Sequence, residues 1–189
     1  GTFDTDEGGT GRNIYLAGNW TNADSYISGA NTVTFDGGVA QSVDAGGAND
    51  DLKDFNNVLI TGASTAVQLS GSSVEIDGTL SLAAGGSLDM NDLNVDLGDD
   101  LSIALGCVWT KGTGTLRLEG TVAPQSLSDG NPTPNDLGDT VVAFSGVTQA
   151  TAIQVTDVTI EAGAQLDSVN LALYVSGDWD NNGSYVSGT

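Results

Sequence analysis

The chain has 189 residues, of which 25 are acidic and 4 basic, with no histidine and one cysteine, so its formal net charge at pH 7 is −21. This charge argues against binding to nucleic acid or to anionic membranes, and the lack of histidine excludes Ser-His-Asp and Cys-His catalysis. No apolar stretch approaches transmembrane length, and the single Cys107 cannot form an intrachain disulfide, whereas a hydrophobic content of 39% predicts a folded protein.

Acidic residues gather in two turn-like segments near the start of the chain. Short carboxylates in glycine-rich turns suit calcium, although neither segment matches the twelve-residue EF-hand loop or the nonapeptide repeat of calcium-binding β-rolls. Solvated turns without a metal ion are the alternative interpretation. The calcium candidates are Asp4, Asp6 and Glu7 in the first segment and Asp44, Asp50, Asp51 and Asp54 in the second.

The middle of the chain alternates aliphatic and polar residues with a period of two, which is typical of half-buried strands. The strands that we expect begin at residues 67, 74, 80, 88, 93 and 101. These steps are too short for a β-sandwich, which needs about 8–12 residues per strand and turn. The sequence therefore predicts an all-β right-handed parallel β-helix, or β-solenoid, of roughly eight or nine coils, with β-sandwich repeats as the alternative.

Internal repeats support a single solenoid over residues 1–189. Residues 18–29 reappear as 177–188 with seven of twelve positions identical, and 114–126 echo 31–42 with one insertion. We place the repeats at 18–42, 106–126 and 177–189. Residues 128–136 contain two of the three prolines, so this segment is predicted to be a loop that protrudes from the rod.

The two ends of the sequence fit one another. The last repeat stops at Thr189, where the first repeat runs on into a strand, and the chain opens with Gly1-Thr2-Phe3-Asp4. Joined end to start, the sequence is similar to that from Tyr26 to Asp36. We therefore expect head-to-tail continuity, either covalent in a longer array or by stacking of copies, and the alternative is an arbitrary boundary within a longer protein.

Aromatic pairs recur in the repeats. Trp20 with Tyr26, and Trp179 with Tyr185, are candidates for stacking on a carbohydrate, because flat aromatic faces bind sugars. A bulky residue that recurs at equivalent positions also fits a role in filling or capping the core. Asn19 and Asn182 lie in sequons for N-glycosylation.

The repeated Gly-Asn/Asp-Trp units at 18 and 177, the Phe55-Asn56-Asn57-Val58 start and the run from Gly78 to Met90 resemble a known family. They are similar to repeats of large bacterial secreted and surface proteins, the filamentous-haemagglutinin-like adhesins. This resemblance implies a right-handed parallel β-helix with a surface or adhesive role, and it carries over no catalytic residue.

From these observations we expect a structural extracellular protein, secreted or on the cell surface, and not an enzyme. Its expected partners are further copies of itself and surface polysaccharide, and calcium is the one cofactor that the composition suggests. The alternative is a β-helix that binds or cleaves polysaccharide. Cleavage by hydrolysis needs two carboxylates that converge on one groove.

Overall fold

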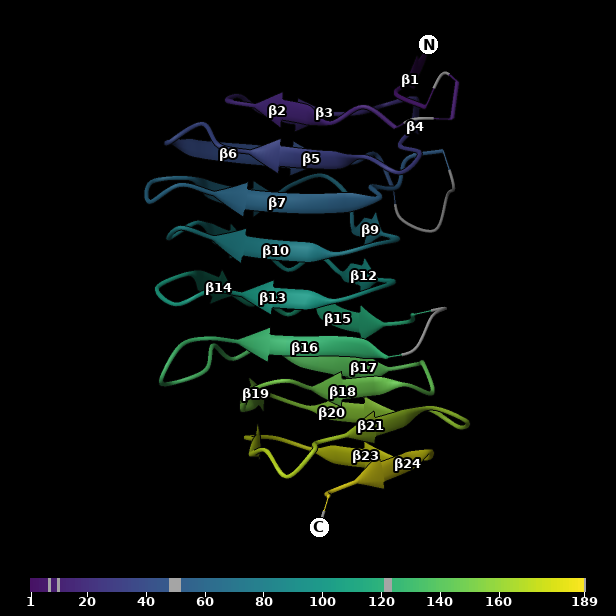
Figure 1. The fold of residues 1–189 in the computed structure, drawn as a ribbon, viewed down its shortest axis with the longest axis vertical. Helices are drawn as coiled ribbons and strands as arrows, with labels where there is room; N and C mark the ends of the chain where they lie inside the picture. The colour runs from purple at the N-terminus through teal and green to yellow at the C-terminus, as the bar shows by residue number, and fades with distance from the viewer. Residues whose placement is uncertain (7, 10, 48–51, 121–123, 189) are drawn as a thin grey trace.

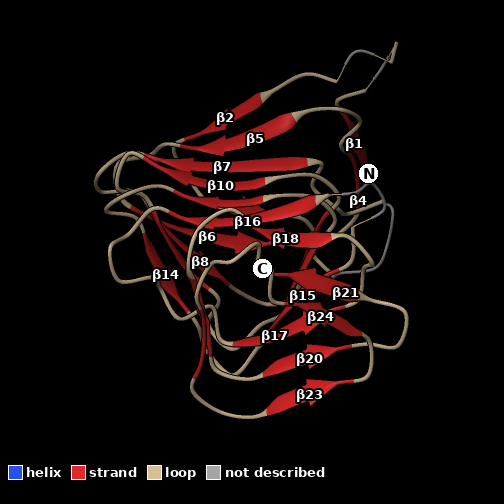
Figure 2. Ribbon diagram, turned by 60° about the horizontal axis from the view of Figure 1, so that its bottom comes forward, coloured by secondary structure: helices blue, strands red, loops and turns tan. Residues whose placement is uncertain are grey.

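The computed structural model describes residues 1–6, 8–9, 11–47, 52–120 and 124–188. These residues form parallel strands stacked as a right-handed β-solenoid of about 8 turns, with no helix among them (Figure 1). No helix in this part of the chain is therefore long and apolar enough to cross a membrane. The sheets surround a common interior, which is seen in the tilted view (Figure 2).

The first face of the solenoid is a nine-stranded parallel sheet. Partner residues in it lie from 19 residues apart, as in Ile14 and Val33, to 26 apart, as in Leu101 and Leu127. This spacing matches a three-sided coil and confirms the predicted solenoid over a sandwich, since all pairs are parallel. Its strands are β2 (Ile14–Leu16), β5 (Thr32–Phe35), β7 (Asn57–Thr61), β10 (Leu80–Ala83), β13 (Leu101–Ile103), β16 (Gln125–Asp129), β18 (Val147–Gln149), β21 (Gln165–Asp167) and β24 (Ser184–Val186).

The second face begins as a five-stranded sheet and resumes as a pair of strands near the C-terminal end. Between the two, residues 130–136 take the place of a strand on the second face of one coil. Asp136 at the end of this segment forms a parallel bridge with Gln154. The strands are β3 (Trp20–Thr21), β6 (Ala40–Asp44), β8 (Ala66–Leu69), β11 (Ser87–Asp89) and β14 (Val108–Thr110), followed by β19 (Ile153–Val155) and β22 (Leu173–Val175).

The third face is a six-stranded sheet that continues toward the N-terminal end through two further strands. The amide of Tyr26 donates to the carbonyl of Leu52, and Phe55 bridges to Ile76, which links the two parts. The N-terminal strands are β1 (Thr2–Asp4) and β4 (Ser25–Ile27), and the others are β9 (Val74–Ile76), β12 (Val95–Leu97), β15 (Thr115–Leu118), β17 (Asp139–Val142), β20 (Val158–Ile160) and β23 (Trp179–Asn181).

The core consists of columns of aliphatic residues that point inward from successive coils. On the third face, Ile76, Leu97, Leu118, Val142 and Ile160 pair in order, and each is at most 3% exposed. The residues between them point outward. The predicted period of two is therefore confirmed, and the strands predicted between 67 and 103 coincide with β8 to β13.

Glutamine side chains close two of the corners where the chain passes between faces. Gln41 accepts from the amide of Gly37 at 3.1 Å and donates to the carbonyl of Leu16 at 3.0 Å. Gln125 likewise accepts from Gly120 at 3.2 Å and donates to the carbonyl of Leu97 at 2.8 Å. The repeats 31–42 and 114–126 thus build the same corner, although β6 lies on the second face and β16 on the first.

The segment expected to protrude, 128–136, begins later than predicted. Strand β16 runs through Ser128 and Asp129, which pair with Ser102 and Ile103 of the coil before, so the break in the strand starts at residue 130. Pro132 lies outside the strands, as expected, at an exposed position. The flanks of the segment are held, because asparagine side chains such as that of Asn135 hydrogen-bond the backbone of the preceding coil.

Candidate functional site

The predicted calcium candidates that lie among the described residues do not gather at one place. Asp4 and Asp6 accept hydrogen bonds from nearby backbone amides, which is a common role of aspartate in turns. Asp44 accepts from the amide of Gly46 at 3.1 Å and from the hydroxyl of Ser72 at 2.9 Å. Glu7, Asp50 and Asp51 lie outside the described residues. Asp54 differs from the rest because it is buried, with 3% of its surface exposed.

Asp54 belongs to a cluster of carboxylates on the third face. Because Phe55 pairs with Ile76 of the next coil, Asp54 lies beside Glu75. Among the described residues, one carboxylate oxygen each from Asp54, Glu75 and Asp77 lie within 4.8 Å of one another. We call these three residues the acidic cluster.

The acidic cluster continues along the solenoid axis as a column of charged residues. Glu75 pairs with Asp96 of the next coil, and Asp96 pairs with Arg117 of the coil after that. Like charges on adjacent strands destabilise a sheet, and Arg117 places a positive charge beside Asp96. Its guanidinium donates to Glu119 at 3.1 Å and makes a bidentate pair with Glu161 at 2.8 and 3.1 Å.

A hollow of about 240 Å³ opens next to the cluster, lined by Glu75, Ile76, Asp77, Gly98 and Glu119. At Gly98 the backbone passes close to the preceding coil, since a Cβ at this position would lie 2.4 Å from the carbonyl oxygen of Asp77. Burial raises the pKa of Glu119, and the nearby charges of Asp96 and Asp77 raise it further, against the opposing effect of Arg117. The carboxylates that line the hollow therefore give it a negative potential, which favours a bound cation.

The raised pKa of Glu119 predicts a stabilising substitution. A carboxyl whose folded pKa lies above its ordinary value of 4.5 stabilises the fold at low pH, and this contribution is lost as the pH rises through the folded pKa. Replacing Glu119 by glutamine should therefore raise the free energy of unfolding at pH 7 by about 0.5 kcal/mol and remove that part of the pH dependence. Urea unfolding at pH 4.5 and 7 measures both effects.

Glu161→Gln is the matched control, because the same arginine holds both glutamates. Its hydrogen bonds with Arg117 lower the pKa of Glu161, so its stabilisation is present at neutral pH and is lost as the pH falls through the folded pKa. Glu161→Gln should therefore destabilise the protein at pH 7. Equal effects of the two substitutions would show that Glu119 is not under net repulsion.

Three carboxylates that approach one another at a surface hollow are suitable ligands for a hard divalent cation. Calcium takes six to eight oxygen ligands at about 2.3–2.6 Å and accepts irregular geometry, so carboxylates supplemented by backbone oxygens and water meet its needs. The arrangement can hold a cation, and with no histidine in the chain it offers none of the imidazole ligands common at zinc sites.

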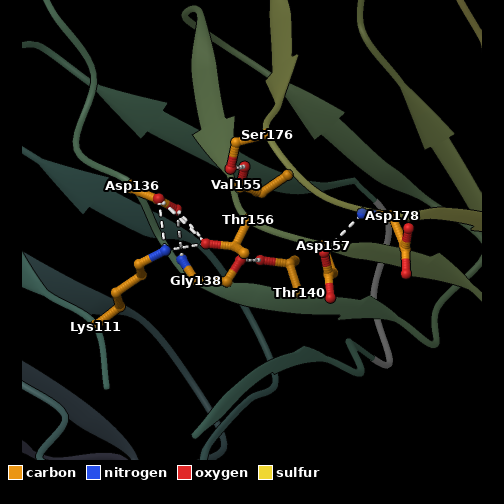
Figure 3. A network of polar contacts seen from close by, with 9 residues as sticks. All are labelled: Lys111, Asp136, Gly138, Thr140, Val155, Thr156, Asp157, Ser176 and Asp178. Atoms are coloured by element: carbon orange, nitrogen blue, oxygen red, sulfur yellow. Dashed lines mark hydrogen bonds and ion pairs between the residues drawn. The ribbon is translucent and has the colours of Figure 1, made fainter. Parts of the chain in front are cut away.

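A second polar cluster joins three consecutive coils at the corner that leads from the second face to the third. Figure 3 shows the side chains of Lys111, Asp136 and Thr156 pointing toward one another, with Lys111 Nζ 2.7 Å from Asp136 Oδ2. Burial alone would raise the pKa of Asp136, but hydrogen bonds from Lys111 and the amide of Gly138 outweigh it and lower the pKa. Because this carboxylate already has its own cation, we assign the cluster a structural role.

The aromatic candidates lie in two different environments. The ring of Tyr26 is 1% exposed and packs between Phe3 and Phe55, and Trp20 meets it edge-on with the centroids 4.9 Å apart. Its phenol accepts from Asn31 at 2.7 Å. The first pair therefore fills the core and presents no open face of Tyr26 to a sugar.

The second aromatic pair lies in the last coil. Trp179 is 42% exposed and contacts Tyr185 edge-on, with the centroids 5.0 Å apart. The two rings meet edge-on, as they do in the first pair. The two tryptophans nevertheless lie on different faces, since Trp179 lies in β23 of the third face and Trp20 lies in β3 of the second.

Sequence reasoning missed Glu75 and Asp77 as partners of Asp54. The signal is a spacing of 21 residues, since Asp54, Glu75 and Asp96 follow one another at this interval and so stack in one column. The interval could be recognised only after the coil length on this face was known. No protein family model, curated protein or solved structure was found to match this chain.

Proposed function

We propose that this protein is a structural module of an extracellular surface or filament, an acidic strut that extends end to end and serves display or adhesion, and that it is not an enzyme. The β-solenoid fold supports a structural repeat protein. The observation that carries the proposal is the stack of about 8 parallel coils, whose sheets run along the length of the solenoid.

The exposure of inward-facing residues at the ends differs from that in the middle. Val33 and Phe35 are 0% and 1% exposed, whereas Ile14 and Leu16, their partners in the first coil, are only half-buried. At the other end Trp179 is 42% exposed although its partner Val158 is 2% exposed. Strand edges of this kind are templates for further pairing, either with a second copy or with more coils of a longer chain.

Charge opposes the association of two copies. Each copy carries a formal net charge of −21, but in about 0.15 M salt charges further apart than about 8 Å are largely screened. Apolar contact and backbone hydrogen bonds at the ends act at shorter range. We therefore expect assembly to be weak at low ionic strength and to increase with salt.

Sedimentation velocity across a series of salt concentrations tests the end-to-end association. The wild-type chain should form species larger than the monomer above about 0.15 M salt. Leu16→Lys, which places a charge at the opening of the core, should abolish these species. Tyr15→Lys, at a 70% exposed position of the same strand that faces away from the core, should leave them. A wild-type chain that stays monomeric at every salt concentration would contradict self-assembly.

A second candidate function is calcium binding at the acidic cluster, supported by the convergence of Asp54, Glu75 and Asp77. Calcium at ten times its Kd should raise the free energy of unfolding by about 1.4 kcal/mol, because it binds the folded chain. Thermal unfolding with calcium and with chelator measures this shift. Asp77→Asn should remove it, whereas Asp180→Asn, with the same change in charge on the same face, should retain it.

The carbohydrate alternative is favoured by the exposed Trp179 beside Tyr185 and by the raised pKa of Glu119 near Asp77. Binding to soluble polysaccharides would quench the fluorescence of Trp179, and Trp179→Ala would abolish that binding. Hydrolysis would release reducing ends and would be lost in Glu119→Gln. Neither signal is expected if the structural proposal holds alone.

A further inference from the structure

The outward-facing residues of the first face carry no charge over most of its length. In β5, β7, β10, β13, β16 and β18, which stack one above another in Figure 1, the described outward-facing residues are all uncharged. The single acidic residue of these strands, Asp129, is 3% exposed and pairs with the inward-facing Ile103. The described corners 62–65, 84–86 and 104–107, which lead from this face to the second, contain no charged residue either. We call the outward-facing side of these strands the uncharged face.

The charges lie elsewhere on the solenoid. Glu75, Asp96 and Arg117 form a row on the third face, and Asp44 and Asp89 lie on the second. Further carboxylates follow the corner between the third and the first face, namely Asp77, Asp99, Asp100, Glu119 and Glu161. The net charge of −21 is therefore concentrated off the uncharged face.

Small hydroxyl side chains dominate the uncharged face. Its central row runs through consecutive strands and contains Leu59, Ser81, Ser102 and Ser128. A hydroxyl group can both donate and accept a hydrogen bond, so a surface of this kind can bind an identical surface. An interface between two copies related by a twofold axis requires such self-complementarity. A second copy of the chain therefore fits this face, whereas two third faces would set carboxylates against carboxylates.

The size of the uncharged face indicates a weak contact. Strands about 4.8 Å apart and about 16 Å wide give it an area of about 450 Å² on each copy. The two copies together would bury about 900 Å², which is less than the roughly 1,200 Å² at which stable protein interfaces begin. We therefore expect association only at high protein concentration. A longer solenoid with more strands of this kind would repeat the contact and bind more tightly.

The two edges of the uncharged face differ, and this difference determines the orientation of the copies. The edge toward the third face is acidic, with Asp77, Asp100 and Glu119, whereas the edge toward the second face has the uncharged corners and the 69% exposed Leu105. A twofold axis parallel to the solenoid axis places the acidic edges of the two copies on opposite sides of the interface. A twofold axis along the strands would bring the acidic edges together, which repulsion between like charges opposes.

We propose that two copies of this chain associate side by side through the uncharged face, with their solenoid axes parallel and their acidic edges on opposite sides. The contact is lateral and uses no residue of the first or last coil. It is therefore distinct from the end-to-end extension proposed above, and it would join extended solenoids into pairs.

Sedimentation equilibrium of Leu16→Lys tests the lateral contact, because this substitution removes the end-to-end association. The variant should form dimers between about 10 μM and about 1 mM at about 0.15 M salt. Ser102→Glu, added to this variant, sets two carboxylates against each other at the centre of the interface and should lower the association constant about tenfold or more. Thr159→Glu makes the same change in charge on the outside of the third face and should leave the constant unchanged. No dimer at about 1 mM, or equal effects of the two glutamate substitutions, would overturn the proposal.

Comparison with the wild-type chain separates this proposal from end-to-end extension. Dimers of Leu16→Lys, with no species larger than the dimer in the wild-type chain, would uphold the lateral contact and reject end-to-end extension. Large wild-type species that disappear in Leu16→Lys and leave no dimer would overturn the lateral contact and uphold the extension.

Disulfide trapping tests the orientation. Leu59 and Ser128 lie in the central row three coils apart, which is about 14 Å along the axis. Leu59→Cys and Ser128→Cys, each combined with Cys107→Ala, are mixed in equal amounts, oxidised and analysed by mass spectrometry. Parallel axes place each position opposite itself, so dimers linked 59 to 59 and 128 to 128 should predominate. An excess of dimers linked 59 to 128, or no disulfide-linked dimer, would overturn the proposal.

Discussion

Replacing Leu97 by alanine is expected to lower the free energy of unfolding by about 3 kcal/mol, because it removes buried methyl groups and leaves a cavity. Leu97 is 0% exposed and lies between Ile76 and Leu118 in one inward-facing column. Coils of a solenoid contact only their neighbours, so the cavity would weaken the contacts of the coil with both adjacent coils. Urea unfolding followed by far-ultraviolet circular dichroism measures the loss.

Leu105→Ala is the control for this substitution. Leu105 is 69% exposed at a turn after β13, so the same chemical change should alter the free energy of unfolding by less than about 0.5 kcal/mol. Similar losses at Leu97 and Leu105 would contradict the division of the chain into inward-facing and outward-facing residues.

Replacing Gln125 by alanine is also expected to lower the free energy of unfolding by about 3 kcal/mol, because it removes buried hydrogen bonds. This side chain is 0% exposed, and it hydrogen-bonds the amide of Gly120 and the carbonyls of Leu97 and Asp99. Alanine would leave these three backbone groups buried without a partner. Urea unfolding measures the cost, and native-state hydrogen exchange should show faster exchange of the Gly120 amide.

Gln68→Ala provides the comparison for Gln125. Gln68 is exposed and donates to Asp89 at 2.8 Å, so water can replace its partner and the loss should be below about 0.5 kcal/mol. Gln41→Ala, at the equivalent corner on another face, should resemble Gln125→Ala. If Gln41 and Gln125 behaved like Gln68, the shared corner would have no energetic role.

Much of the fold could be predicted from the sequence because the period of two is a local property of each strand. Runs such as Leu80-Ser81-Leu82 and Leu101-Ser102-Ile103 place aliphatic side chains on one side, and they pair directly in the structure. Short steps between strands indicated coils in place of hairpins. The resemblance to β-helix repeats agrees with the architecture that the structure shows.

The placement of the repeats could not be predicted, because sequence similarity records the local corner and not the face on which it lies. Trp20 and Trp179 lie at equivalent positions of two units that are identical at seven of twelve positions, yet one lies on the second face and the other on the third. Coils of 19 to 26 residues shift the register between repeats, as the spacings of Ile14 from Val33 and of Leu101 from Leu127 show. The face on which a repeat lies can be found only by counting the strands that precede it in the structure.

Of the three residues of the acidic cluster, Asp54 alone could be predicted from the sequence, because the other two come from a different coil. Asp54 was a candidate because of its neighbours in sequence, several of which lie in turns of their own or outside the described residues. Its structural partners, Glu75 and Asp77, come from the next coil. Contacts between coils depend on coil length, which varies along the chain, so composition alone pointed to calcium without locating the ligands.

Electron cryomicroscopy of the purified chain at moderate salt tests the central claim most directly. We expect fibres with strands stacked about 4.8 Å apart along the axis and an advance of about 40 Å per copy. Short rods of uniform length at every salt and protein concentration would contradict end-to-end extension of this chain.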